Sequence, residues 1–240
     1  MPMNIFQERR RDMSEIEEKL SIVRRRIESA RARSLWKQPV ELVAVTKFHP
    51  LPAMEEAAAL GVASVGENRV QELEEKRREG HLPVRWYLIG HLQKNKVRKA
   101  VMLADLIQSA DSLEILREID KRAAGIGKMQ EVLLEFNISG EAAKHGFPPE
   151  ALETAAKEAC ALSHVRVRGL MCMAPHYEDP EATRPVFRRA REMWETMKGL
   201  FPEGQVTVLS MGMTNDFEIA VEEGSTMVRV GTAIFGQREY

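Results

Sequence analysis

The chain has 240 residues, of which 44% are hydrophobic and 30% are charged, and its formal net charge is −1. This length suits one large domain, and the near-neutral charge provides no overall field that would attract nucleic acid or an anionic membrane. No apolar run approaches the ~20 residues that span a bilayer, and the N-terminus lacks the apolar centre of a signal peptide, so we expect a cytoplasmic protein.

A long helix is predicted at the start of the chain, from about residue 5 to residue 33. Its apolar residues recur at spacings of three and four, which is typical of a helix with one buried face; they are Met13, Ile16, Leu20, Val23 and Ile27. The opposite face is rich in arginine, which could bind RNA or a partner chain. Because no aromatic residues are interleaved with the arginines, we expect this face to be solvated.

Strands and helices are predicted to alternate from residue 40 onward. The strand-like runs are 40–46, 63–66, 84–89, 106–109, 131–136, 165–169, 206–209 and 226–230. The helix-like segments between them are 52–60, 69–79, 95–103, 113–124, 149–162, 181–198 and 216–223. Eight such units predict an α/β fold, a single (β/α)8 barrel of the TIM type. An open doubly wound sheet is less favoured, because no Gly-x-Gly-x-x-Gly motif follows the first strand.

The domain organisation follows from the same pattern. No linker rich in Pro, Gly or Ser and no low-complexity tract interrupts the chain. We therefore expect one domain over residues 1–240, in which residues 1–39 form an extra N-terminal helix packed outside the barrel.

Lys47 ends the first predicted strand. Side chains alternate along a strand, so Val43, Val45 and Lys47 are predicted to share one face. In a barrel, chemistry belongs at the carboxyl ends of the strands. The lysine is therefore predicted to lie at the functional end of the barrel.

The ends of the seventh and eighth strands predict an anion site. Ser210 and Gly212 follow the seventh strand, and Gly231 and Thr232 follow the eighth, beside Arg229. Hydroxyl groups, exposed backbone N–H groups and a fixed cation suit a phosphate, and these two loops often bind phosphate in such barrels.

The next helix is predicted to begin with a capping box. Thr214 or Asn215 is expected to be the N-cap, with Glu218 three residues after Asn215.

A lysine on one side of the barrel mouth and a phosphate site on the other favour a ligand with an aldehyde and a phosphate. Pyridoxal 5'-phosphate has both groups. Its aldehyde can condense with Lys47 if burial or nearby positive charge lowers the lysine pKa. Arg229 shares a face with Met227 and could reach the ring nitrogen, and an arginine cannot accept a proton from it.

The sequence resembles the pyridoxal phosphate homeostasis proteins. The motifs that carry the resemblance are VTK (45–47), GENRVQE (66–72), IGHLQKNK (89–96), NISGEAAKHG (137–146), GLM (169–171), LSMGM (209–213) and VRVGTAIFG (228–236). Thr214 stands where this family often has serine. The resemblance implies a barrel like the N-terminal domain of alanine racemase.

The resemblance also implies the roles of individual residues. It implies a Schiff base between the cofactor and Lys47, phosphate contacts from Ser210, Gly231 and Thr232, and Arg229 near the pyridine nitrogen. It further implies that Asn68 and Met211 belong to the cofactor site.

Two functions remain open from the sequence. The first is a carrier without robust catalysis, which holds pyridoxal phosphate and supplies it to the apoenzymes that use it. The second is an amino-acid racemase or lyase, which needs a second base that relatives recruit as a tyrosine from an extra domain. The chain ends at Tyr240, just past the eighth strand, which favours the carrier and a monomer.

No metal site is expected from the sequence. Cys160 and Cys172 are isolated, and the spacing of the histidines His49, His91, His145 and His176 matches no metal-ligand pattern.

Overall fold

The computed structural model describes residues 13–141 and 145–237, and its strands follow the predicted order. The strands are β1 (Glu41–Val45), β2 (Ser64–Glu67), β3 (Arg85–Leu88), β4 (Leu106–Ala110), β5 (Gln130–Phe136), β6 (Val165–Cys172), β7 (Val208–Ser210) and β8 (Met227–Val230). All neighbouring strands are parallel, and β1 pairs with both β2 and β8, so the sheet closes into a barrel. The predicted (β/α)8 barrel is confirmed.

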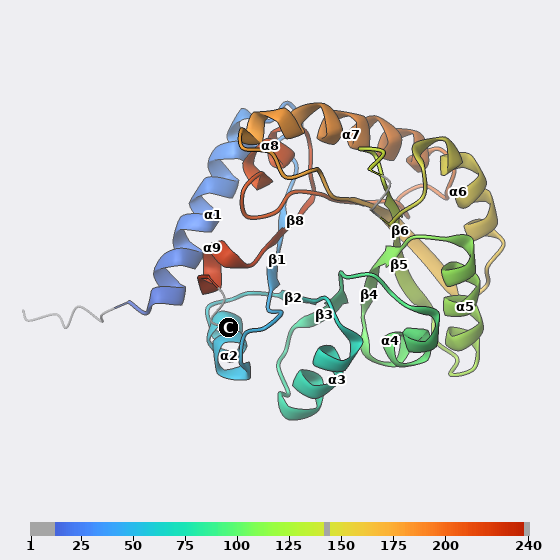
Figure 1. Cartoon of the computed structure of the whole chain (residues 1–240), viewed down its shortest axis with the longest axis horizontal. Coiled ribbons are helices and arrows are strands. Elements are labelled where there is room, and N and C mark those ends of the chain that lie inside the picture. Colours follow the sequence, from blue (N-terminus) through green and yellow to red (C-terminus); the bar gives the residue numbers. More distant parts are fainter. Residues whose placement is uncertain (1–12, 142–144, 238–240) are drawn as a thin grey trace, which may run out of the picture.

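Helices follow the strands and surround them, as Figure 1 shows. They are α1 (Glu15–Arg33), α2 (Leu51–Ala59), α3 (Val70–Glu79), α4 (Val97–Leu103), α5 (Leu113–Ala124), α6 (Leu152–Cys160), α7 (Arg184–Lys198), α8 (Phe217–Glu222) and α9 (Thr232–Phe235). Short 3-10 helices precede three of them: η1 (Lys94–Lys96), η2 (Pro149–Ala151) and η3 (Pro180–Thr183). Within the described residues, no helix is long and apolar enough to cross a membrane.

The N-terminal helix begins later than predicted. Ser14 is its N-cap, and the Ser14 hydroxyl accepts a hydrogen bond from the backbone N–H of Glu17. This cap starts α1 at Glu15, so Met13 precedes the helix and is exposed. Residues 5–12 of the predicted helix lie outside the described residues.

Helix α1 packs on the outside of the barrel beside α8 and α9, as seen in Figure 1. Leu20, Val23 and Ile27 of the predicted stripe are buried. Arg26 adds an ion pair to Glu218 of α8 at 2.6 Å. Part of the arginine-rich face is therefore used within the chain.

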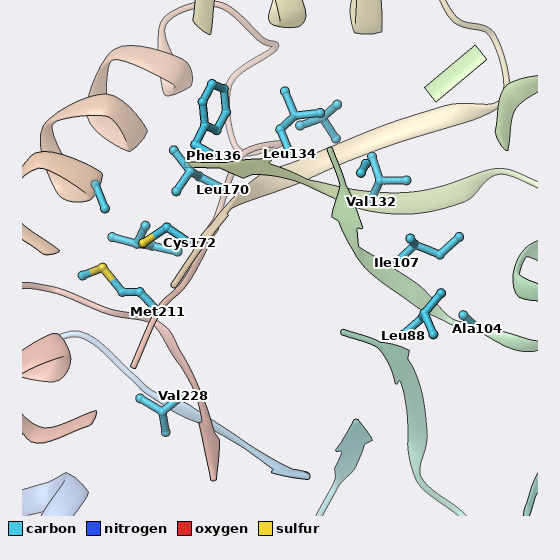
Figure 2. Close-up of a cluster of buried hydrophobic side chains, with 14 of the residues drawn as sticks. Leu88, Ala104, Ile107, Val132, Leu134, Phe136, Leu170, Cys172, Met211 and Val228 are labelled. Carbon is cyan, nitrogen blue, oxygen red and sulfur yellow. The ribbon is translucent and has the colours of Figure 1, made fainter. Parts of the chain in front are cut away.

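Two hydrophobic clusters lie on opposite sides of the sheet. Inside the barrel are Val43, Tyr87, Leu106, Leu133, Met171 and Met227. The larger cluster lies between the strands and the helices, and Figure 2 shows part of it, including Leu88, Val132, Leu170 and Val228. Alternation along each strand sends side chains to the two clusters in turn.

Strand β6 extends past Gly169, where the sequence predicted its end. A Cβ atom at Gly169 would lie 1.7 Å from the backbone oxygen of Val208. The glycine therefore allows close approach of β6 to β7 instead of ending the strand.

Candidate functional site

A cavity of ≈ 670 Å³ opens at the carboxyl-terminal end of the barrel strands. Its lining includes Val45, Lys47, Asn68, Ile89, Glu135, Met173, Thr214, Arg229, Gly231 and Thr232. Five of the residues predicted from the sequence therefore meet here: Lys47, Asn68, Arg229, Gly231 and Thr232. This is the edge at which barrels of this type place their active sites.

Lys47 lies two residues beyond the end of β1 and is half-buried. Val43 belongs to the interior cluster, and Val45 lines the cavity together with Lys47. The prediction that these three residues share one face is confirmed.

A buried ionic network fixes the backbone just before Lys47. The Nζ atom of Lys76 in α3 donates to the backbone oxygen of Thr46 at 2.6 Å and to Oε1 of Glu67 at 2.7 Å. The Thr46 hydroxyl donates to the same Glu67 oxygen at 2.5 Å. Glu67 is fully buried, and this burial raises its pKa while Lys76 opposes the rise.

The same network fixes the backbone just after Lys47. Oε1 of Glu72 accepts from Lys76 Nζ at 2.8 Å and from the backbone N–H of Phe48 at 2.6 Å. Phe48 has a φ of 66°, in the left-handed region that few non-glycine residues adopt, so the chain turns sharply here. Sequence reasoning missed this support. The only local signal is the (i, i+4) spacing of Glu72 and Lys76, which is common on exposed helix faces.

Asn68 follows β2 and reaches the cavity because Gly90 lets the next loop approach it. A Cβ atom at Gly90 would lie 2.5 Å from the backbone oxygen of Asn68. A side chain at position 90 would therefore displace Asn68 or the loop after β3.

Arg229 is a buried cation held by two hydrogen bonds. Its Nη1 donates to Oγ of Ser210 at 2.6 Å, and its Nη2 donates to the backbone oxygen of Cys172 at 2.9 Å. Burial lowers its pKa, and the acidic side chains of Glu135 and Asp216 oppose that shift. As predicted, Arg229 shares the inner face of β8 with Met227.

Ser210 and Met211 do not line the cavity. The Ser210 hydroxyl lies behind Arg229, accepts from it, and donates to Oε1 of Gln108 at 2.7 Å. The Met211 side chain points to the outer cluster, as Figure 2 shows. Their assignment to a cofactor site stays a prediction, and the Ser210 side chain is committed to positioning Arg229.

The loops after β7 and β8 form the rim next to Lys47 and not across the mouth from it, because β8 pairs with β1. Thr214 lines the cavity together with Gly231 and Thr232. Gly212 shapes the first loop: its φ is 94°, and a Cβ atom there would lie 2.6 Å from Cβ of Ala220. The first N–H groups of a helix have no partner within it, so the start of α9 at Thr232 offers backbone donors.

The predicted capping box at the start of α8 is wrong. The N-cap is Asp216, whose Oδ1 accepts from the backbone N–H of Met213 at 2.6 Å. Glu218 is instead paired with Arg26 of α1, a contact between distant parts of the chain that local sequence does not reveal.

Glu135 of β5 places a carboxyl group in the cavity wall. The residue is only 4% exposed. Burial raises its pKa to about 7; the nearby Asp111 adds to the rise, and Arg229 opposes it. Glu135 was not among the site residues predicted from the sequence. Glu135 could have been recognised because it is a charged residue two positions after Leu133, on the strand face that points into the barrel.

We expect the ionisation of Glu135 to lower the free energy of unfolding as the pH rises from about 4.5 to about 7. The folded pKa of Glu135 is about 7 and its ordinary value is 4.5, so the folded state binds the proton more tightly between these values. Stability is thus greatest below the lower pKa and is lost as the pH rises, by on the order of 3 kcal/mol. The free energy of unfolding of Glu135→Gln, measured in urea at several pH values, should not show this pH-dependent loss. A pH-independent difference between the two proteins would contradict the assignment.

Three further polar side chains meet at the rim. His91 Nδ1 lies 2.9 Å from Oδ2 of Asp111, and His145 Nδ1 lies 3.9 Å from the same oxygen. The imidazole rings are stacked, with centroids 3.7 Å apart. The sequence did not predict this cluster, because its members follow three different strands.

Neither tyrosine in the described part of the chain lines the cavity. Tyr87 lies inside the barrel, where its hydroxyl donates to Glu41 at 2.7 Å. Burial and Glu41 raise its pKa far above the ordinary value. Tyr177 is exposed.

Comparison with known proteins agrees with this architecture. The family model of the alanine racemase N-terminal domain matches residues 19–239. A pyridoxal phosphate homeostasis protein of Aquifex aeolicus is 39% identical over 225 residues, which cover 93% of this chain and 98% of that protein.

Solved structures of PipY from Synechococcus elongatus are also similar. PipY without pyridoxal phosphate superposes with a TM-score of 0.83 at 37% identity, and PipY with pyridoxal phosphate bound superposes with a TM-score of 0.80 at 35% identity. Each comparison covers 92% of this chain and 100% of PipY.

Proposed function

Because the chain belongs to the pyridoxal phosphate homeostasis family of alanine racemase N-terminal barrels, we propose that it binds pyridoxal 5'-phosphate in the cavity above the strands. One observation carries the proposal. A lysine amine, a buried guanidinium and a rim of hydroxyl and backbone donors line the same ≈ 670 Å³ cavity. A relative of similar length and fold binds this cofactor.

The donor set fits the three polar parts of the cofactor. Pyridoxal phosphate supplies an aldehyde that condenses reversibly with amines, an electron-withdrawing pyridine ring and a phosphate. Lys47 is the amine proposed to hold the aldehyde as a Schiff base. Its backbone is fixed on both sides by the network around Lys76.

The phosphate is proposed to lie at the rim formed by Gly231, Thr232 and Thr214. Thr214, Gly231 and Thr232 line a common cavity there, and α9 begins at Thr232. Backbone N–H groups at a helix start favour an anion. Asn68, which follows β2 beside β1 and lines the same cavity, is proposed to contact the ring substituents.

Arg229 is proposed to lie beside the pyridine nitrogen. Its guanidinium is held by Ser210 and Cys172 and stays a hydrogen-bond donor. A donor at this position leaves the ring nitrogen unprotonated, which weakens the electron withdrawal needed for most reactions of the cofactor. This supports a carrier that holds the cofactor and supplies it to apoenzymes within the cell.

The proposal is tested by loading the protein with pyridoxal phosphate and removing the free cofactor. We expect a yellow protein from which borohydride traps the cofactor on one lysine, identified by peptide mass spectrometry. Loaded protein should also activate a pyridoxal-phosphate-dependent apoenzyme. Failure to bind would overturn the whole proposal, whereas binding without activation would overturn only the carrier role.

The racemase or lyase alternative is tested with the same loaded protein. Tyr87 is committed to Glu41 inside the barrel, and Tyr177 does not line the cavity, so neither supplies a second base there. Incubation with D- and L-amino acids, followed by chiral chromatography, measures turnover. Conversion of an amino acid at an ordinary enzymatic rate would contradict the carrier role and show that the protein is an enzyme.

A further inference from the structure

Two histidines and one aspartate converge at the rim, beyond the residues proposed to hold the cofactor. His91 follows β3, Asp111 follows β4, and His145 lies on the segment after β5. One ligand atom from each lies within 4.8 Å of the other two. Among the described residues, these three side chains form a group that could hold a metal ion.

The chemistry of the three groups suits a divalent transition metal. Two imidazoles and one carboxylate are typical ligands of Zn²⁺ and related borderline ions, with one position left for water or substrate. Asp111 is almost buried, with 7% of its side chain exposed. Its ion-pair partners in the described ranges are His91 and His145, so no lysine or arginine neutralises it there.

The geometry requires a small rearrangement on binding. Metal–ligand bonds of about 2.0–2.1 Å place neighbouring ligand atoms about 3.3 Å apart, closer than the 4.8 Å limit found here. The two rings are nearly parallel, with 11° between their planes, so their lone pairs do not point at a common centre. At 40% and 58% exposure, the His91 and His145 side chains can rotate around the buried Asp111 with little loss of packing.

We propose that His91, Asp111 and His145 bind a divalent transition-metal ion, with Zn²⁺ as the representative probe. All three residues line a second cavity of ≈ 460 Å³, and the two histidines also line the main cavity. The ion therefore lies between the two spaces. Its open coordination position binds water or an oxygen anion, such as the carboxylate of a small ligand.

A titration of the protein without pyridoxal phosphate tests the proposal independently of the proposed function. Tag-free protein carrying Cys160→Ser, which removes the exposed thiol, is mixed with Zn²⁺ in competition with a chelating indicator. We expect a single ion per chain, with affinity reduced at least about tenfold in both His91→Gln and His145→Gln. Co²⁺ should give an absorption spectrum of a coordinated ion that both variants lose.

His164→Gln is the matched control, because His164 also lies beside a carboxylate, 4.0 Å from Asp120, but has no second histidine in a metal-ligating group. Its Zn²⁺ affinity should equal that of the parent. Circular dichroism confirms that each variant is folded. The absence of competition with the indicator would overturn the proposal, as would equal affinity in the parent and the two rim variants.

Discussion

Replacing Lys47 with alanine is expected to abolish covalent capture of pyridoxal phosphate. The borohydride-trapped adduct and the yellow colour should both disappear, because the proposed Schiff base needs the Lys47 amine at the end of β1. The proposed phosphate and ring contacts from Gly231, Thr232 and Arg229 are unaffected by this substitution, so weak noncovalent binding should persist. Mass spectrometry of the reduced protein and equilibrium dialysis measure the two effects separately.

Lys99→Ala is the control for this experiment. Lys99 is exposed and paired with Glu74 on the outside of the barrel, away from the cavity lining. Its adduct should equal that of the parent protein. An adduct that survives in Lys47→Ala, on any other lysine, would refute the assignment of the Schiff base.

Replacing Lys76 with methionine is expected to cost about 3 kcal/mol of unfolding free energy at neutral pH. The change removes the cation that compensates the fully buried Glu67 and the donor to the Thr46 backbone oxygen. The pKa of Glu67 is already raised by burial and should rise further. Because the folded pKa of Glu67 then lies further above the unfolded one, the penalty should grow as the pH rises and shrink in acid.

The double variant Lys76→Met/Glu67→Gln separates charge from packing. Removing the buried carboxylate together with its cation should recover at least about 1 kcal/mol relative to Lys76→Met alone. Lys99→Met, at an exposed pair, should cost less than about 1 kcal/mol. Urea unfolding of the four proteins measures these differences. Equal costs for Lys76→Met and Lys99→Met would show that the buried network contributes nothing.

The same Lys76 variant should also slow the capture of pyridoxal phosphate. Thr46 and Phe48 lose their common anchor, so the turn that presents Lys47 is less fixed. The rate at which the yellow colour appears measures this effect.

Features with a local cause were predicted well from the sequence. The strand and helix order, and the common face of Val43, Val45 and Lys47, follow from hydrophobic periodicity, which a few consecutive residues express. Arg229 and the Gly231–Thr232 pair line the cavity, as expected from their position at the end of the eighth strand, and their cofactor contacts stay predictions. The start of α1 was predicted wrongly because the Ser14 cap sets it, and hydrophobic periodicity does not reveal helix caps.

Features built from distant residues were not predicted. The hydrogen bond from Arg229 to the Ser210 hydroxyl, across the β7–β8 pair, was not foreseen, while the assignment of Ser210 to a cofactor site stays a prediction. No role was predicted for Lys76, which the packing of α3 on β2 buries against Glu67.

The sequence by itself determined that this chain forms eight alternating units, with Lys47, Arg229 and the Gly231–Thr232 pair at one end of the strands. The reason is that side-chain alternation is a property of each strand alone. Only the tertiary structure decided which charged side chains are buried next to one another, as Lys76 and Glu67 are. The pairing of β4 with β3 and β5 brings together the loops of His91, Asp111 and His145, and only the folded loops turn the three side chains toward one another.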